Sequence, residues 1–261
     1  MVGDCLIMDS QPQSPKPAPD LHAFIFSGPG PTLAHLIPFA AWLILMQALG
    51  EPTGWKYALR TGLGLGLLLW ARPWRWYPRF QIKHLPLTLG VGVLVLLVWI
   101  VPEMGFMDHF PALKAFYFRF LVMPFGQLPP YVDPQTLRHL AESPYRPDVC
   151  GWALALTRMA GSAFVIAIAE EFFWRGFLYR WLIQRDFSGL SLRAFELQPF
   201  LIMVALFGFE HDRWLVGMFA GAAYGGLVLI TGSMWAAVLA HVLTNFLLGL
   251  YVLGSGNYGF W

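Results

Sequence analysis

The stretch that decides the fold is residues 152–175, which read WALALTRMAGSAFVIAIAEEFFWR. The apolar run from Trp152 to Ala169 is long enough to cross the hydrocarbon core of a bilayer as a helix. It ends in two adjacent carboxylates, Glu170 and Glu171. A carboxylate near the bilayer core costs at least about 2.5 kcal/mol on insertion scales, so we expect both to have partners, a function, or both.

The composition of the whole chain is that of an integral membrane protein. Of its 261 residues, 57% are hydrophobic and only 12% are charged, whereas a soluble domain carries about 25% charged residues. The net charge of +2 is too small to indicate a nucleic-acid partner. Cys5 and Cys150 have neither metal-ligand spacing nor a disulfide pattern. We therefore expect an all-α, polytopic membrane protein with the lipid bilayer as its surroundings.

Apolar stretches separated by turn signals predict seven or eight transmembrane helices. The seven expected spans are residues 33–50, 57–71, 85–101, 152–174, 199–211, 214–230 and 234–253. An eighth results if residues 110–125 or 176–183 enter the bilayer, and the aromatic stretch 110–125 is otherwise expected to lie in the interface plane.

The expected domain organisation is simple. Residues 1–31 are predicted to be a disordered, proline-rich cytoplasmic tail. Residues 32–261 are predicted to form a single integral membrane domain, in which residues 151–254 supply the catalytic helices. The long connection 102–149 looks like an extramembrane loop over much of its length.

Two arginine-rich segments predict the orientation of the chain in the membrane. Residues 72–83 and 175–193 are both basic, and the positive-inside rule places such loops in the cytoplasm. Two predicted spans separate the two segments, so both can lie on the same side. This orientation also places the N-terminus in the cytoplasm.

The first group of polar residues in an apolar setting is Glu170, Glu171 and Arg175. Glu171 and Arg175 are four residues apart on a helix, with the acid on the N-terminal side, which is the favourable order for an ion pair. Glu170 lies about 100° further round the helix. Arg175 can therefore neutralise Glu171 and leave Glu170 free for chemistry, although a structural ion pair beside a boundary carboxylate is the alternative.

Two further groups lie on later spans. His211 follows an apolar half-helix and has Phe207 one turn behind it. His241 and Asn245 are four residues apart inside an apolar run, so they share one face. Two polar side chains in the middle of a span need an interior partner or a water-filled cavity. The alternatives are an interface histidine at His211 and an interhelical hydrogen-bond node at His241 and Asn245.

Together these groups are what attack on a peptide carbonyl requires. A carboxylate helped by a histidine can take a proton from water, and imidazole and amide donors can stabilise the oxyanion. Alternatively, Glu170, His211 and His241 bind a Zn²⁺ ion that activates the water. The His-Glu-x-x-His motif of soluble zinc proteases is absent. We expect a polar active-site cavity within the C-terminal helices.

These residues resemble the CAAX protease and bacteriocin-processing family of intramembrane peptidases, which includes the type II CAAX prenyl endopeptidases. The family pattern is Glu-Glu-x-x-x-Arg, then Phe-x-x-x-His, then His-x-x-x-Asn. The chain carries Glu170, Glu171 and Arg175, then Phe207 and His211, then His241 and Asn245. The resemblance covers roughly the C-terminal 110 residues, from the span that begins near Trp152.

The resemblance implies a role for each matched residue. Glu170 would activate the attacking water with help from His211, while His241 and Asn245 would form the oxyanion site. Glu171, Arg175 and Phe207 would support the site. Both metal-free and zinc-dependent mechanisms fit these residues, and we favour the metal-free one, so no cofactor is firmly implied.

The resemblance also suggests a substrate and a location. The substrate would be a membrane-associated protein or peptide, handled by a bacterial relative that serves protein sorting or export, such as the exosortase-associated group. The expected location is the bacterial inner membrane. Because Glu170 lies near the cytoplasmic end of its predicted span, the cavity is expected to open to the cytoplasm.

Two other functions compete with the intramembrane endopeptidase. A proton-coupled transporter also uses membrane-embedded glutamate and histidine, but it predicts repeated halves with broken helices, and the sequence shows neither. A catalytically silent scaffold that binds the transmembrane helix of a partner would tolerate Glu170→Gln, because binding does not need the proton acceptor.

Overall fold

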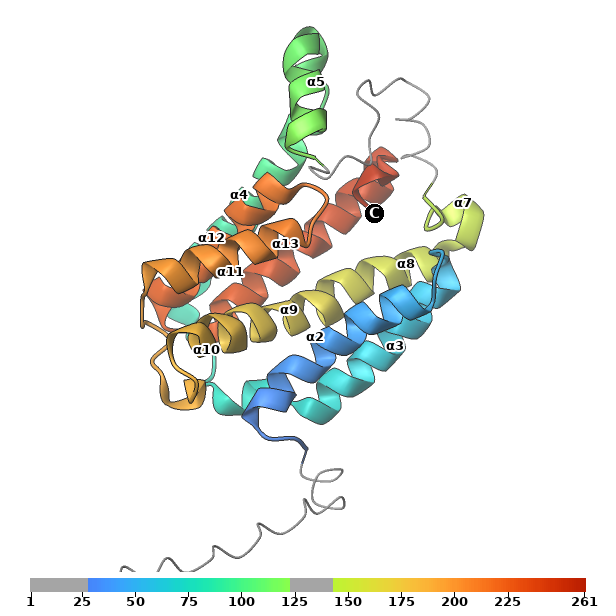
Figure 1. Cartoon of the computed structure of the whole chain (residues 1–261). Helices are drawn as coiled ribbons and strands as arrows, with labels where there is room; N and C mark the ends of the chain where they lie inside the picture. Colours follow the sequence, from blue (N-terminus) through green and yellow to red (C-terminus); the bar gives the residue numbers. More distant parts are fainter. Residues whose placement is uncertain (1–27, 123–142) are drawn as a thin grey trace, which may run out of the picture.

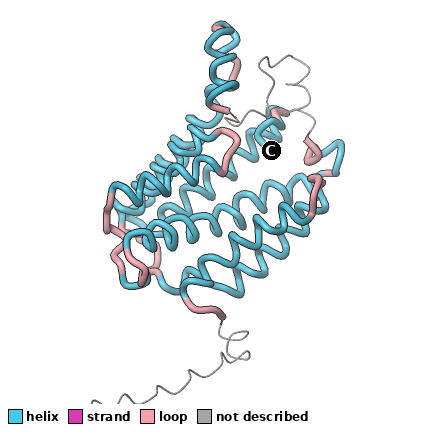
Figure 2. The backbone as a smooth tube through the Cα atoms, viewed as in Figure 1, coloured by secondary structure: helices cyan, strands magenta, loops and turns pink. Residues whose placement is uncertain are grey.

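The computed structural model describes residues 28–122 and 143–261. These residues fold into helices joined by short loops, and no strand occurs among them (Figure 2). The all-α expectation is thus confirmed for the described ranges. Most of the tail predicted for residues 1–31, and the end of the stretch 110–125, lie outside these ranges.

Five helices in the described ranges are long and apolar enough to cross a membrane, which makes this an integral membrane protein. They span Pro31–Ala48, Ile82–His109, Trp152–Ile183, Trp214–Thr231 and Met234–Ser255. The other two predicted spans are also helical, as α3 (Gly54–Ala71) and α11 (Leu197–Phe209). However, α11 has only 13 residues and α3 carries Lys56 and Arg60, so the count of seven or eight spans stays a prediction.

The N-terminal helices form one layer of the bundle. Helix α2 (Pro31–Ala48) and α3 run antiparallel and pack along the helix that begins with α8 (Trp152–Gly161) (Figure 1). Glycine permits this close approach, because a Cβ atom at Gly161 would lie 2.3 Å from Thr61 Oγ1. The short helix α5 (Pro111–Phe120) projects from the bundle beyond α4 (Leu85–Ile100) (Figure 1).

The remaining helices form the second layer. Helix α12 (Trp214–Thr231) returns antiparallel to α11, and α13 (Met234–Ser255) packs on both α12 and α4. The hydroxyl of Thr244 on α13 lies 2.8 Å from the carbonyl of Gly92 on α4 and can donate a hydrogen bond to it. A Cβ atom at Gly92 would lie 2.8 Å from the carbonyl of Ala240. The absence of a side chain at Gly92 therefore sets how closely α13 approaches α4.

The helix predicted for residues 152–174 is longer than expected and is not uniformly α-helical. It runs without a break from Trp152 to Ile183 and includes α8, α9 (Ala167–Glu171) and α10 (Tyr179–Ile183). Two π-helical segments, Ser162–Ile166 and Phe172–Leu178, lie on either side of α9. Residues 176–183 thus continue this helix and add no eighth span. Single π turns inside α-helices occur frequently at functional sites.

The arginines predicted to mark a cytoplasmic loop at residues 175–193 fall into two groups. Arg175 and Arg180 are buried inside the bundle, where the guanidinium of Arg180 donates to the carbonyls of Gly176 and Leu190. Only Arg185 and Arg193 follow the end of the helix. The prediction of a four-arginine loop was therefore wrong, because buried carboxylate and carbonyl groups accept hydrogen bonds from the first two arginines.

Candidate active site

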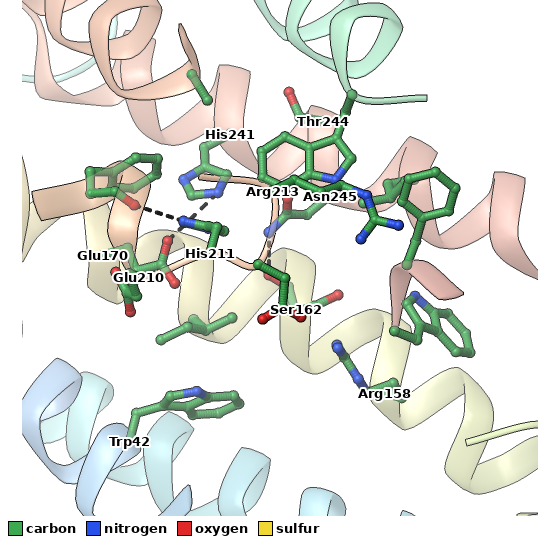
Figure 3. A pocket seen from close by; sticks show the side chains of 18 of the residues that line it. Trp42, Arg158, Ser162, Glu170, Glu210, His211, Arg213, His241, Thr244 and Asn245 are labelled. Carbon is green, nitrogen blue, oxygen red and sulfur yellow. Dashed lines mark hydrogen bonds and ion pairs between the residues drawn. The ribbon is translucent and has the colours of Figure 1, made fainter. Parts of the chain in front are cut away.

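A cavity of about 420 Å³ lies between the two layers and brings together the predicted site residues from three helices (Figure 3). Glu170 enters it from α9, His211 follows α11, and His241 and Asn245 come from α13. Aromatic and aliphatic side chains make up much of the remaining wall. They include Trp42, Trp99, Phe207, Tyr224, Ile166 and Leu248.

Glu171 is the centre of a buried chain of charged groups. Its Oε1 accepts a hydrogen bond of 2.9 Å from Arg175 Nη1, as the four-residue spacing predicted. The same oxygen lies 2.8 Å from Nδ1 of His241. Arg175 also donates to the carbonyl of Gly221 on α12 at 3.0 Å, and its guanidinium stacks over the ring of Phe207 at 4.2 Å. Glu171 and Arg175 thus connect their own helix to α11, α12 and α13.

The bond to Glu171 determines which nitrogen of His241 is available to the cavity. A carboxylate paired with arginine is a hydrogen-bond acceptor, so Nδ1 of His241 carries the donated proton. Tyr224 fixes the ring from one side, because its own ring stacks on His241 with centroids 4.8 Å apart. Nε2 of His241 is therefore the nitrogen left to face Glu170.

Glu170 is buried, yet it takes no part in the Glu171–Arg175 pair. Its Oε2 lies 3.8 Å from Nε2 of His241, which is too long for a direct hydrogen bond. This oxygen has no hydrogen-bond partner among the residues that the structure describes. A buried carboxylate oxygen that faces a cavity and has no hydrogen-bond partner can accept a proton from a bound water molecule.

His211 lies in the same cavity but is held by a different contact. Its Nδ1 lies 2.8 Å from the carbonyl of Phe207, and because a carbonyl only accepts, Nδ1 is the protonated nitrogen. Phe207 and Trp99 flank the ring, with centroid distances of 4.9 Å and 5.4 Å. No hydrogen bond or ion pair joins His211 to Glu170 within the described ranges. The histidine that lies beside Glu170 is instead His241.

Asn245 is held by one of the π-helical segments. Its Nδ2 donates a hydrogen bond of 3.0 Å to the carbonyl of Ser162, the first residue of that segment (Figure 3). The amide has two N–H groups, and this bond uses one of them. The other N–H can serve a group inside the cavity.

Several residues of the cavity were not singled out from the sequence. Glu210 follows α11, and its Oε2 accepts a hydrogen bond of 3.2 Å from Trp174 Nε1. Although part of Glu210 is exposed, its surroundings in the cavity raise its pKa to about 7, chiefly through burial. Arg60 and Arg158 also line the cavity. Both are charged residues inside apolar helices, and that signal could have identified them.

The cavity leads away from the basic loop at residues 72–83. From Glu170 it extends past Ser162 to Arg158 (Figure 3). Arg60 and Trp261 also line it, and Trp261 is the last residue of the chain, whose end is marked C in Figure 1. The expectation that Glu170 lies near the end of its span was wrong, because the helix continues to Ile183 and Glu170 lies about 20 Å from that end at 1.5 Å rise per residue. The side of the membrane on which the cavity opens stays a prediction.

The proposed zinc ligands do not form a metal site in this arrangement. Within the ranges 28–122 and 143–261, no three His, Cys, Asp or Glu side chains are placed to hold one ion. No step of the chemistry below is therefore routed through a metal.

The fold and the cavity define a polytopic α-helical membrane protein with a polar site enclosed by apolar helices. The family model of Rce1-like type II CAAX prenyl endopeptidases matches residues 152–247 of the chain. The match supports the family expected from the three motifs. It includes α8 to α12 and most of α13, and it leaves α2 to α5 outside. Neither a curated protein nor a solved structure matches the chain.

Proposed function

We propose that this protein is an intramembrane endopeptidase that hydrolyses a peptide bond of a membrane-associated protein or peptide. The match to the model of a protease family supports hydrolysis of peptides in general. The observation that supports a specific mechanism is the position of Glu170, whose Oε2 has no hydrogen-bond partner in the described residues and lies 3.8 Å from Nε2 of His241 in a polar cavity.

The charges of the buried cluster permit an ionised base. Arg175 balances Glu171. Burying charges without partners is expensive, so a neutral cluster requires one further proton, carried by either Glu170 or His241. When His241 carries this proton, Glu170 is a carboxylate and can act as a base. The bond from Nδ1 to Glu171 stabilises that form of His241.

The hydrolysis then proceeds as follows. Glu170 takes one proton from a water molecule as the water oxygen attacks the carbonyl carbon of the substrate. Nε2–H of protonated His241 and the second N–H of Asn245 donate to the oxyanion that forms. When the C–N bond breaks, Glu170 returns the proton to the leaving amine. His211, held by the carbonyl of Phe207, lines the cavity beside these groups.

The open end of the cavity supports a substrate presented from one particular side. The positive-inside rule puts the basic loop 72–83 in the cytoplasm. The cavity leads toward the opposite end of the bundle. We infer that the scissile bond approaches from the extracytoplasmic side, which favours a protein-sorting or export substrate over a prenylated cytoplasmic C-terminus. A bacterial inner membrane, with the N-terminus in the cytoplasm, is the proposed location.

The experiment that tests this function compares the peptides of membranes that contain the active protein with those that contain Glu170→Gln. We expect a defined set of cleavage products that requires Glu170. The exposed Glu51→Gln is the matched control and should give the same products as the unmodified protein. If Glu170→Gln membranes contain the same products at the same rate, the protein is a scaffold and not a protease of this mechanism.

A further inference from the structure

We propose that Arg60 and Arg158 form an anion-binding subsite at the open end of the cavity, which takes a carboxylate of the substrate. The two side chains come from α3 and α8 and both line the cavity. The proposal rests on the proposed function, since it names the chemical group by which that same cavity recognises its substrate.

The two guanidinium groups are held together by aromatic rings. Arg60 lies over the ring of Trp42 at 4.5 Å and over that of Tyr57 at 4.7 Å. Arg158 lies over the ring of Tyr57 at 4.4 Å, and its Nη1 donates to the Tyr57 hydroxyl at 3.1 Å. Tyr57 thus places two like charges close together. Cation–π contacts stabilise each charge, but they do not cancel the repulsion between them.

The two arginines lack a carboxylate partner in the described part of the chain. Neither takes part in an ion pair there, and the Nε atoms of both are buried without a hydrogen-bond partner. A nearby arginine behaves differently. Arg213 lines the same cavity and donates to Glu103 through Nε at 2.5 Å and Nη2 at 2.7 Å. The protein therefore supplies a carboxylate for Arg213 and leaves the pair at Arg60 and Arg158 for a group from outside.

The chemistry of the guanidinium group favours a carboxylate. Its planar fork binds carboxylates through two parallel N–H···O bonds. In a partly buried setting, such a group would relieve the repulsion between the two arginines and supply the missing acceptors. The position of the pair at the open end places this group of the substrate on the side from which the peptide enters.

The helix also sets how far the carboxylate lies from the scissile bond. Arg158 and Glu170 are twelve residues apart on one continuous helix. This separation corresponds to about 18 Å at 1.5 Å per residue, which an extended peptide covers in about five residues. We therefore expect the recognised carboxylate, either the C-terminus or an acidic side chain, to lie about five residues from the bond that is cut.

Binding can be tested without hydrolysis. The probes are two pools of short apolar peptides of random sequence, one with free C-terminal carboxylates and the other amidated. A third pool is amidated but contains one internal glutamate, which distinguishes the two sources of the carboxylate. Each pool is captured on Glu170→Gln protein in phosphatidylcholine nanodiscs and quantified by mass spectrometry. We expect the free-carboxylate or the glutamate pool to be retained about tenfold to a hundredfold better than the amidated pool.

Variants assign this preference to the two arginines. Arg60→Gln and Arg158→Gln should each reduce it about tenfold or more, whereas Arg158→Lys should keep part of it because the charge is retained. Arg185→Gln is the matched control, since Arg185 lies at the other end of the helix, stacked on Trp181. Thermal unfolding of each variant identifies loss of fold, and a purely structural role would weaken retention of all pools equally.

The outcomes separate this proposal from the proposed function. Equal retention of all pools by the Glu170→Gln protein overturns the subsite, and so does an equal effect of Arg185→Gln. In nanodiscs that contain phosphatidylglycerol, the lipid could bind the two arginines instead of the peptide. If the preference for carboxylate peptides is lost there and the lipid is found bound, the site binds a lipid headgroup and the proposed substrate subsite is overturned as well. If the protein retains carboxylate peptides better than amidated ones but the unmodified protein, which keeps Glu170, cuts none of the retained peptides, the hydrolase mechanism fails and the subsite stands.

Discussion

Glu171 and His241 lie 70 residues apart in the sequence and are joined by a hydrogen bond of 2.8 Å between Oε1 and Nδ1. This bond connects the helix that carries the Glu-Glu pair to the last transmembrane helix. It gives Glu171 two roles, because the same oxygen also accepts from Arg175. The carboxylate therefore both fixes the bundle and selects the nitrogen that His241 presents to Glu170.

The first prediction concerns Glu171 and Arg175. Arg175→Ala leaves the carboxylate of Glu171 buried with only His241 as a partner, and removing one member of a buried ion pair typically costs about 3–5 kcal/mol. We expect Arg175→Ala, and also Glu171→Gln, to lower both the yield of folded protein and its activity. Thermal unfolding after purification measures the effect. Glu170→Gln is the matched control and should keep near-normal yield, since Glu170 makes no ion pair with Arg175.

The second prediction ranks the two histidines. His241 faces Glu170 at 3.8 Å, whereas His211 has no hydrogen bond to Glu170 in the described ranges. We expect His241→Gln to reduce the cleavage rate about 10²-fold to 10⁴-fold, the range for loss of a proton-transfer group, and His211→Gln to reduce it less. Initial rates on a substrate found by peptide analysis test this order. A larger loss in His211→Gln would mean that His211 is the partner of the base.

Much of the fold could be predicted from the sequence because apolar length alone determines where a chain can cross a bilayer. The stretch 85–101 corresponds to α4, and the stretch 234–253 corresponds to α13. The ion pair of Glu171 and Arg175 also follows from helical spacing. Composition could not predict that the helix continues past Trp174. Arginines that follow an apolar run are typical of the end of a span, and the sequence does not show that two of them have buried partners.

The relative positions of the site residues were harder to predict. Two π-helical segments flank α9, and a wider turn changes the direction in which later side chains project. A helical wheel drawn at 100° per residue therefore cannot place Glu170 against one particular histidine. The close approach of α13 to α4 depends on Gly92 and Thr244, whose contact involves no local sequence pattern.

The third prediction concerns metal dependence. The described residues provide no group of three metal-binding side chains placed to hold one ion. We expect cleavage by purified protein to persist after chelation with EDTA or phenanthroline, and elemental analysis to find zinc well below one ion per chain. Activity that is lost on chelation and restored by zinc would contradict the metal-free mechanism.

The fourth prediction concerns pH and Glu210. Burial raises the pKa of Glu210 from 4.5 to about 7 in the folded protein, although Trp174 and Arg175 act in the opposite direction. The folded state thus favours the protonated form. The stability that this form contributes is present below about pH 4.5 and is lost as the pH rises through about 7.

Glu210→Gln, which cannot ionise, should therefore have a flatter dependence of unfolding temperature on pH between these two values. Thermal unfolding of both proteins across this range gives the comparison, and the exposed Glu51→Gln provides the control. Parallel curves for the unmodified protein and Glu210→Gln would show that Glu210 does not titrate in this interval.

The last prediction tests the side on which the cavity opens. Ser162 lines the cavity between Glu170 and the arginine pair, so a cysteine introduced there reports access from the open end. In a background that lacks Cys5 and Cys150, Ser162→Cys should react with a membrane-impermeant thiol reagent added outside intact cells or right-side-out vesicles. A cysteine at Arg79, in the basic loop, should react only from the cytoplasmic side. Labelling of both positions only from the cytoplasmic side would place the open end of the cavity in the cytoplasm and would redirect the search toward cytoplasmic substrates.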